Sequence, residues 1–280
     1  MPDVDRYAVF GDPIGHSLSP KIHRLFAEQT NQEMEYLAIR APADDFRGIL
    51  ANFLESGGKG ANCTLPLKEL AFSIADRVTQ RAQYCGAVNT LTVETNGALV
   101  GDNTDGIGLI RDLKINLELE LTGKRILILG AGGAARGIMG PLIEEKPESL
   151  TIANRTAAKA HQLAKAFSGI EKIVGCGYES LGHQSFDLII NATPTSLSGG
   201  IPDIDAHLLS RNGYCYDLAY QLTGPTPFVT WGIAQGARSS HDGLGMLVEQ
   251  AAEAFYLWRD IRPDTRSVIF QIKEQPGLSA

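Results

Sequence analysis

Two hydrophobic patterns alternate along the chain, and together they predict alternating strands and helices. Short unbroken apolar runs are typical of strands buried on both faces of a sheet, whereas apolar residues three and four positions apart are typical of helices. Near the start, the pattern predicts a strand at residues 7–10 and then a helix with Ser19 as N-cap and Pro20 at its first position. A second strand at about 35–39 and a helix at about 43–56 follow.

The segment 59–68 combines a predicted strand with the start of a helix. Alternation along the strand places Asn62 and Thr64 on the same face. Pro66 is expected to begin the helix, which puts Lys68 in its first turn, where the positive end of the helix dipole disfavours a cation. Lys68 is therefore a candidate acid–base group, and a solvated surface lysine is the alternative. The expected buried stripe of this helix is Leu67, Leu70, Ala71, Ile74 and Ala75.

The dipeptide Asn96-Gly97 separates a predicted strand at 87–93 from a second strand and is typical of a two-residue β-hairpin. The second strand runs into a polar segment that contains Asp102 and Asp105 and precedes a predicted helix. The pattern alone leaves helix capping open as the role of either carboxylate.

From residue 121 onward, strands and helices alternate regularly. This arrangement predicts a doubly wound parallel sheet that binds its ligand at the carboxyl ends of the strands. The expected strands are residues 125–129, 149–153, 172–174, 187–191, 214–218 and 237–240. The fold class is accordingly α/β with two domains, the second of them Rossmann-like.

The first strand of this region leads directly into a glycine cluster, Gly130-Ala131-Gly132-Gly133-Ala134-Ala135. It follows the pattern G-x-G-x-x-A, in which the first glycine makes the tight turn, the second admits a pyrophosphate and the small last residue allows close helix packing. Free N–H groups at the start of the following helix attract phosphate. The segment predicts a dinucleotide site, and an ordinary glycine-containing turn is the alternative.

The end of the next strand distinguishes between the two nicotinamide dinucleotides. A NAD site usually has an acidic residue there, which binds the ribose 2′-hydroxyl. This chain instead has Asn154-Arg155-Thr156, with Lys159 soon after. Arg155 and Lys159 favour a 2′-phosphate. NADP(H) is the predicted cofactor, and a solvated basic turn is the alternative.

Two later segments, Ala192-Thr193-Pro194 and Ala219-Tyr220, follow strand ends and are candidates for the nicotinamide side of the site. In the predicted helix 244–255, Gln250 interrupts an otherwise apolar stripe. A buried amide needs partners, so Gln250 either contacts a ligand or is a satisfied structural residue. This helix is expected to return to the first domain, and the tail beyond Glu274 is expected to fray.

Composition narrows the range of partners. A net charge of −7 and a pI near 5.4 argue against nucleic acid or an anionic membrane surface. The chain has no apolar run of the roughly 20 residues that a membrane span needs, and its charged N-terminus lacks a signal-peptide core. We therefore expect a cytoplasmic protein. The four cysteines are widely separated and the six histidines lack ligand spacing, so no metal and no redox dithiol are expected.

Taken together, these motifs resemble the shikimate dehydrogenase family, and the resemblance covers nearly the whole chain. The segments that carry it are 15–20, 60–68, 86–90, 101–106, the glycine cluster, 154–156 and 242–246. It implies reversible NADPH-dependent reduction of 3-dehydroshikimate to shikimate. It also implies a substrate and catalytic domain of residues 1–104 completed by 243–280, an NADP domain of residues 105–242, and a monomer or homodimer.

The resemblance also assigns roles to single residues. Lys68 and Asp105 would be the catalytic pair, of which the nearby Asn103 is not a part. The implied substrate ligands are Ser17, Ser19, Asn62, Thr64, Asn89, Tyr220 and Gln250. The implied cofactor ligands are Gly130, Ala131, Gly132, Gly133, Ala134, Asn154, Arg155, Thr156, Lys159, Thr193, Leu218, Gly243 and Met246.

Three other functions fit parts of the pattern. An enzyme that also oxidises quinate, often with NAD, is disfavoured by the basic turn at Arg155. A non-catalytic NADPH sensor would lack Lys68 or Asp105, and a folate-linked dehydrogenase would not require the serine loop, Asn89 or Gln250. The chain departs from the family at Cys63, in the absence of a glycine near Ser196, and in a longer segment after Tyr220.

Overall fold

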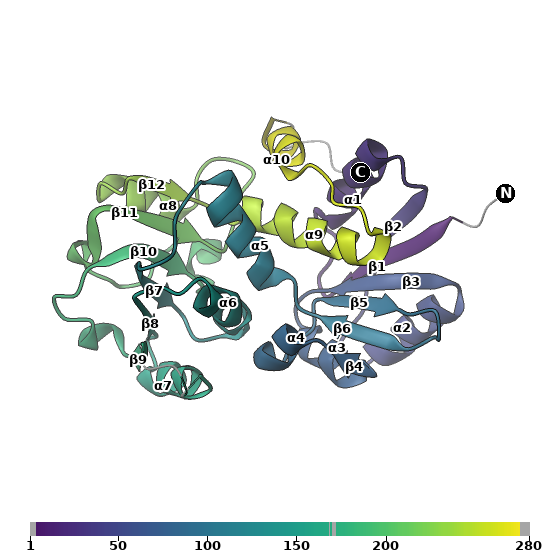
Figure 1. Cartoon of the computed structure of the whole chain (residues 1–280), viewed down its shortest axis with the longest axis horizontal. Helices are drawn as coiled ribbons and strands as arrows, with labels where there is room; N and C mark the ends of the chain where they lie inside the picture. Colours follow the sequence, from purple (N-terminus) through teal and green to yellow (C-terminus); the bar gives the residue numbers. More distant parts are fainter. Residues whose placement is uncertain (1–3, 168, 170–171, 275–280) are drawn as a thin grey trace. The chain divides into compact units, whose positions relative to one another are not determined.

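The computed structural model in Figure 1 describes residues 4–167, 169 and 172–274. It divides into two compact units: the first comprises Met1–Gly108 and Leu247–Ala280, and the second comprises Leu109–Met246. Both boundaries lie four residues later than those that the family resemblance implies, so Asp105 belongs to the first unit. The reason is local, because the Asp105 side chain is hydrogen-bonded to Lys68 and Asn89 of that unit. The tail beyond Glu274 lies outside the described residues.

The described part of the first unit contains a mixed sheet with strand order β2-β1-β3-β5-β6-β4. β1 is parallel to β2 and β3, and β5 is antiparallel to β3 and β6. The strands are β1 (Asp5–Gly11), β2 (Met34–Arg40), β3 (Gly58–Cys63), β4 (Arg77–Val78), β5 (Thr90–Val93) and β6 (Leu99–Asp102). The helices are α1 (Ser19–Thr30), α2 (Phe46–Glu55), α3 (Lys68–Ile74), α4 (Gln80–Cys85), α9 (Leu244–Arg259) and α10 (Thr265–Glu274).

Strand alternation explains how both faces of this sheet are covered. Ala8 and Phe10 of β1 point to the face where α2, α3 and α4 pack. Tyr7 points to the other face and stacks on Trp258 of α9, with ring centroids 4.6 Å apart. His23 of α1 lies against the same tryptophan. The two faces therefore have separate apolar layers.

Three helices begin at residues other than those expected. α2 begins at Phe46 rather than at about residue 43. α1 begins one residue early, at Ser19, with Leu18 in the N-cap position, and the hydroxyl that accepts a hydrogen bond there is that of Ser17, from the Ser19 N–H at 3.2 Å. α3 begins two residues late, at Lys68 rather than Pro66. Pro66 instead lies in a turn closed by a hydrogen bond from the Leu67 N–H to the Thr64 carbonyl oxygen.

The predicted stripe of α3 and the predicted hairpin also need correction. Only Leu67 and Ala71 of the stripe are fully buried, whereas Leu70 is 36% exposed. The turn between β5 and β6 has three residues, because the hydrogen-bonded pair is Glu94 and Ala98 and only Gly97 has a positive φ, of 85°. Three-residue loops with glycine at the left-handed position are a common alternative to the two-residue hairpin turn.

The described part of the second unit contains a parallel sheet with strand order β12-β11-β10-β7-β8-β9. Its strands are β7 (Arg125–Leu129), β8 (Ser149–Ala153), β9 (Ile173–Cys176), β10 (Phe186–Asn191), β11 (Leu209–Asp217) and β12 (Ser239–His241). α5 (Asp105–Arg111) begins in the first unit, continues into the second and leads into a π-helical turn, η1 (Asp112–Asn116). The other α-helices of the second unit are α6 (Gly133–Glu144), α7 (Ala157–Lys165) and α8 (Pro227–Ala234). Three 3₁₀ turns are η2 (Tyr178–Ser180), η3 (Thr195–Ser198) and η4 (Ala206–Leu208).

This strand order is that of a dinucleotide-binding Rossmann sheet, and it confirms the predicted doubly wound topology. The order reverses between β7 and β10, which places a ligand crevice at the carboxyl ends of these two strands. Ile126, Leu127, Ile128 and Leu129 are all completely buried, because apolar clusters cover both faces of the sheet. Burial on both faces is the physical reason for the unbroken apolar run at 126–129.

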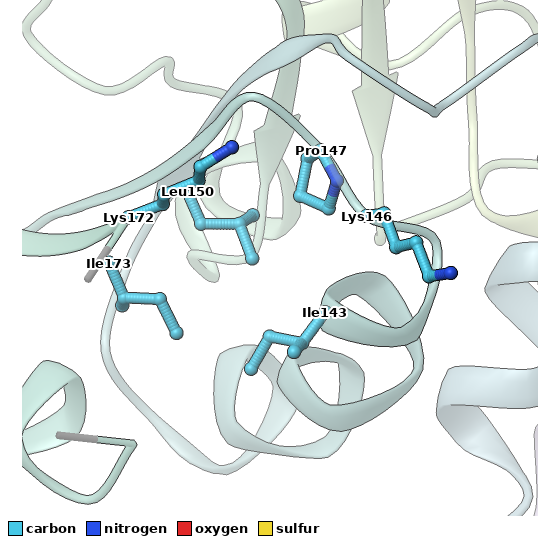
Figure 2. Close-up of a pocket in the computed structure, with 6 residues that line it drawn as sticks. All are labelled: Ile143, Lys146, Pro147, Leu150, Lys172 and Ile173. Atoms are coloured by element: carbon cyan, nitrogen blue, oxygen red, sulfur yellow. The ribbon is translucent and has the colours of Figure 1, made fainter. Parts of the chain in front are cut away.

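Figure 2 shows a pocket at the other end of the strands of this sheet, near the amino ends of β8 and β9. Its volume is about 240 Å³, and Ile143, Pro147, Leu150 and Ile173 form its apolar wall. Lys146 and Lys172 complete the lining. The pocket is thus separate from the carboxyl-end crevice.

All four cysteines are buried free thiols. Burial raises the pKa of Cys63 and of Cys215 to about 12, so both are uncharged at neutral pH. Within the described residues, no helix has the length and apolar character needed to span a bilayer. The same residues contain no cluster of three or more side chains suited to holding a metal ion.

Candidate active site

The first unit brings together the two predicted catalytic residues at the starts of two helices. Lys68 is the first residue of α3, and Asp105 is the first residue of α5. The Lys68 ammonium donates to Asp105 Oδ2 at 2.5 Å, and the side chains are 28% and 17% exposed. The pair is therefore enclosed but still accessible to a small molecule.

Asn89 connects this pair to the predicted substrate ligand Gln250. Asn89 Nδ2 donates to Asp105 Oδ1 at 2.8 Å and lies 3.3 Å from Gln250 Oε1. Asn89 Oδ1 accepts the Thr104 N–H at 2.9 Å and the Thr90 hydroxyl at 2.8 Å. Gln250 Nε2 in turn donates to the Leu247 carbonyl oxygen. These contacts fix the orientation of the Asn89 amide, since each of its atoms has a defined donor or acceptor role.

The side chain of Asn62 is already satisfied within the protein. Its Oδ1 accepts the Tyr36 hydroxyl at 2.6 Å, and its Nδ2 donates to the Asn89 carbonyl oxygen and the Thr90 hydroxyl. Burial raises the pKa of Tyr36 well above its ordinary value, although a hydrogen bond with Ser19 opposes the rise, so the phenol stays protonated and donates. Asn62 thus holds Asn89 in place, directly through the Asn89 carbonyl oxygen and indirectly through Thr90, whose hydroxyl donates to Asn89 Oδ1.

The remaining predicted substrate ligands lie on neighbouring loops of the first unit, except one. Ser17 and Ser19 flank the start of α1, and Thr64 follows β3, with its N–H bonded to the Phe10 carbonyl oxygen. Tyr220 lies in the second unit, three residues after β11 ends.

An ion-pair network anchors the loop that carries Asp105. Asp102, the last residue of β6, accepts two hydrogen bonds of 2.6 Å from Arg81 of α4, and Arg81 also contacts Glu253 of α9. The Asp102 carboxylate further accepts the Asn103 N–H. Because a bidentate arginine pair has a defined geometry, the network holds the strand end from which Asp105 projects.

A buried histidine packs against Tyr36, whose hydroxyl donates to Asn62. His23 is fully buried, stacked on Tyr36 with ring centroids 4.0 Å apart. Burial lowers the pKa of His23 to about 3, so its ring is neutral at physiological pH. It forms part of the apolar support of the site.

The glycine turn of the second unit fits a pyrophosphate. Gly130 has φ 106°, and a Cβ there would approach the Ala192 carbonyl oxygen to 3.0 Å, so both conformation and space require glycine. Gly132 precedes α6 in the N-cap position, and within the described residues no side chain caps that helix. A Cβ on Gly132 or Gly133 would meet nothing within 4 Å. The start of α6 therefore has no side-chain cap and has unfilled space beside its two glycines, as an anion site needs.

The basic turn after β8 lies at the surface. Arg155 and Lys159 are exposed, and neither has a carboxylate partner in the part of the chain that the structure describes. Asn154 forms its own turn, with Nδ2 donating to the Thr156 carbonyl oxygen at 3.0 Å. No acidic side chain stands at this strand end, so the residues present fit a 2′-phosphate.

Four further cofactor candidates lie at the carboxyl ends of β10, β11 and β12. The Thr193 N–H and hydroxyl both donate to Asn191 Oδ1. The Leu218 N–H donates to the Asn191 carbonyl oxygen, and a Cβ on Gly243 would overlap the Leu218 carbonyl oxygen. The Met246 N–H donates to the Tyr216 hydroxyl. The second unit thus groups these residues around the ends of β10 and β11.

Tyr36, Thr104 and Arg81 were not among the residues that the sequence pattern singled out. Tyr36 sits in an ordinary amphipathic strand, and Thr104 looks like one more member of a polar loop. Arg81 has partners at Asp102 and Glu253, of which the second is 172 positions away. The hydrophobic periodicity of either segment carries no signal for a contact between residues so far apart in the sequence.

Comparison with known proteins covers both units. Residues 9–91 match the family described as shikimate dehydrogenase substrate binding domain, and residues 113–198 match shikimate / quinate 5-dehydrogenase. Residues 243–269 match the shikimate 5′-dehydrogenase C-terminal domain. The chain is 55% identical to the shikimate dehydrogenase (NADP(+)) of Methylococcus capsulatus, over 96% of each chain.

Solved structures agree with the sequence matches. An Ael1 enzyme from Pseudomonas putida is 48% identical with a TM-score of 0.91, and the alignment covers 95% of this chain and 97% of that one. The shikimate 5-dehydrogenase of Thermus thermophilus, in complex with NADP(H) and shikimate, is 34% identical with a TM-score of 0.85 and coverages of 96% and 99%. With this identity over nearly its full length, the chain belongs to the shikimate dehydrogenase family.

Proposed function

We propose that the protein catalyses the reversible NADPH-dependent reduction of 3-dehydroshikimate to shikimate. The observation that carries the proposal is the Lys68–Asp105 pair, 2.5 Å apart and joined through Asn89 to Gln250. This is a proton donor with a fixed partner, surrounded by short side chains that bond hydroxyl groups. The relatives named shikimate dehydrogenase (NADP(+)) support the same reaction.

The polar groups of the first unit suit a small polyhydroxylated acid. Ser17, Ser19, Thr64, Asn89 and Gln250 would bind its carboxylate and hydroxyls, with Tyr220 as a further ligand. Such a site rejects analogues that lack a hydroxyl, because its own polar groups would be left unpaired. Asn62, whose amide is already bonded to Tyr36 and Asn89, would act by holding Asn89.

The second unit would hold NADPH. The turn Gly130–Gly133 with Ala134 would bind the pyrophosphate, and Asn154, Arg155, Thr156 and Lys159 would bind the 2′-phosphate end. Thr193, Leu218, Gly243 and Met246 would line the nicotinamide end. NADPH, when bound, supplies the hydride for reduction of the 3-oxo group.

Lys68 would supply the proton. In the direction of reduction, its ammonium donates to the oxygen of the former carbonyl as negative charge develops there. Asp105 keeps the ammonium in place through Oδ2, and its Oδ1 is held by Asn89. In the reverse direction the same amine accepts the proton from the shikimate hydroxyl.

The same proposal includes a cytoplasmic location and a monomeric or homodimeric state. The four buried free thiols support a reducing compartment. Cell fractionation and light scattering of the purified protein test these two points.

The activity test is reduction of the nicotinamide, followed by its absorbance, with four pairs of substrate and cofactor. We expect rapid reduction of NADP by shikimate and little with NAD or quinate. Comparable rates with NAD and quinate would place the protein with the broader quinate-oxidising enzymes. Absence of turnover with every pair, despite NADPH binding, would refute the proposed reaction.

A further inference from the structure

Asp217, the last residue of β11, is an enclosed carboxylate with no exposed surface. Four neutral donors converge on it. Its Oδ2 accepts the Ser196 hydroxyl at 2.5 Å and the Thr226 hydroxyl at 2.7 Å. Its Oδ1 accepts Asn191 Nδ2 at 3.0 Å and the Ala219 N–H at 3.1 Å. No lysine, arginine or histidine forms an ion pair with it among the residues described.

Burying a carboxylate without a counter-charge costs folding free energy, so we expect Asp217 to have a role that offsets this cost. Burial raises the pKa of Asp217, while the hydrogen bonds from Ser196, Thr226, Ala219 and Asn191 oppose the rise. A carboxylate is the side chain that accepts four hydrogen bonds without presenting a donor of its own. At this position a carboxylate can accept hydrogen bonds from donors on several loops at once.

The four donors come from three separate segments. Asn191 and Ser196 belong to the end of β10 and the loop after it, Ala219 belongs to the loop after β11, and Thr226 caps α8 by accepting the Val229 N–H. Asp217 therefore ties two strand ends and one helix start to a single point.

Three of the four residues proposed for the nicotinamide end, Thr193, Leu218 and Gly243, are connected to Asp217 by hydrogen bonds or by the chain. Thr193 is bonded to Oδ1 of the asparagine whose Nδ2 donates to Asp217. Leu218 is the next residue in the chain, and its N–H donates to the Asn191 carbonyl oxygen. The Gly243 N–H donates to the carbonyl oxygen of Ala219, whose own N–H donates to Asp217.

We propose that Asp217 is a positioning residue for the nicotinamide end of the cofactor site, an inference that rests on the proposed function. It fixes the loops after β10 and β11 without touching the ligand. The glycine turn at Gly130–Gly133 and the basic turn at Arg155 follow β7 and β8 and have no hydrogen bond to Asp217 within the described chain. The 2′-phosphate end of the dinucleotide thus depends on a different support from the nicotinamide end.

The test is Asp217→Asn in the full-length protein, with binding measured for NADPH and for adenosine 2′,5′-bisphosphate, which lacks the nicotinamide half. Asparagine has the same size, so the fold should be retained, but its amide nitrogen cannot accept the hydrogen bonds that the Ser196 and Thr226 hydroxyls now donate to Oδ2. We expect kcat to fall by about 10- to 100-fold, because small misplacements of reacting groups cost factors of this order. NADPH affinity should fall, whereas adenosine 2′,5′-bisphosphate affinity should stay within about twofold of wild type.

Asp187→Asn is the matched control, because Asp187 lies on the neighbouring strand β10 and holds Arg125 at the opposite edge of the sheet. It should leave both affinities and kcat unchanged. Ser196→Ala removes one donor and should cause the same selective loss to a smaller extent, which keeps the test informative if Asp217→Asn does not fold.

The proposal would be overturned if Asp217→Asn and Ser196→Ala lost affinity equally for NADPH and for adenosine 2′,5′-bisphosphate. It would also be overturned if both of these variants kept the wild-type kcat and NADPH affinity. An inactive wild-type protein would instead refute the proposed reaction, and the ratio of the two affinities would still test the role of Asp217.

Discussion

Lys68→Ala is expected to remove most of the catalytic rate while leaving the fold nearly as stable as before. Lys68 donates to Asp105 at 2.5 Å, and the pair is partly open to solvent. Loss of such a pair costs up to about 1 kcal/mol of stability. Removing a cation from the first turn of α3 returns about 0.3–1 kcal/mol. Asp105 also keeps its hydrogen bond from Asn89.

The effect on the chemical step is larger than this residual change in stability. A positioned general acid contributes about 10²- to 10⁴-fold, which corresponds to roughly 2.7–5.5 kcal/mol in the activation free energy. We expect kcat to fall within that range. The KM for shikimate should change little, because Ser17, Ser19, Thr64 and Gln250 remain.

The assay is steady-state oxidation of shikimate at saturating NADP, with thermal unfolding of the same samples. Lys114→Ala is the matched control, since Lys114 forms a similar pair with Glu145 at 2.6 Å in the second unit. It should keep the wild-type kcat. A Lys68→Ala variant that retains kcat, or that raises KM alone as expected for lost ground-state binding, would show that Lys68 does not supply the proton.

Three further variants test other parts of the site. His23 has a pKa of about 3 in the folded chain against about 6.5 when unfolded, so the neutral ring stabilises the fold above pH 6.5 and this stability is lost as pH falls towards 3. By urea unfolding, His23→Phe should therefore lose about 2 kcal/mol less than wild type between pH 7 and pH 5, and equal losses would contradict the assignment. Arg155→Ala should weaken NADPH binding about tenfold or more in a fluorescence titration and leave the KM for shikimate unchanged; comparable losses in both count against its role. Asn89→Asp places a second carboxylate where Asn89 Nδ2 now lies 2.8 Å from Asp105, so kcat/KM should fall at neutral pH and recover in acid; a wild-type pH profile would refute this.

The second unit was the more predictable part of the fold, because its signals are local. The apolar run at 126–129 and the glycines after it specify a buried strand, a tight turn and a helix start within a dozen residues. Boundaries were less predictable. α3 begins at Lys68 and not at Pro66, because the Thr64 carbonyl oxygen accepts the Leu67 N–H and closes a turn first.

The site itself depends on contacts that the pattern does not encode. Lys68 and Asp105 are 37 residues apart and meet because β3, β5 and β6 are adjacent in the sheet. The pattern could single out Lys68 by its unfavourable helix position and Gln250 by its break in an apolar stripe. Joining them needed the family resemblance. Tyr36 and Arg81 gave no signal, since their roles arise only from their partners.

The central claim is that the protein moves a hydride between shikimate and NADP. The most direct measurement uses shikimate deuterated at the carbon that bears the 3-hydroxyl, with mass spectrometry of both products. The proposed function predicts one deuterium in the NADPH formed and none at that carbon of the 3-dehydroshikimate. Formation of unlabelled NADPH would contradict the proposed function. So would the absence of NADPH formation by wild-type protein that binds both shikimate and NADP.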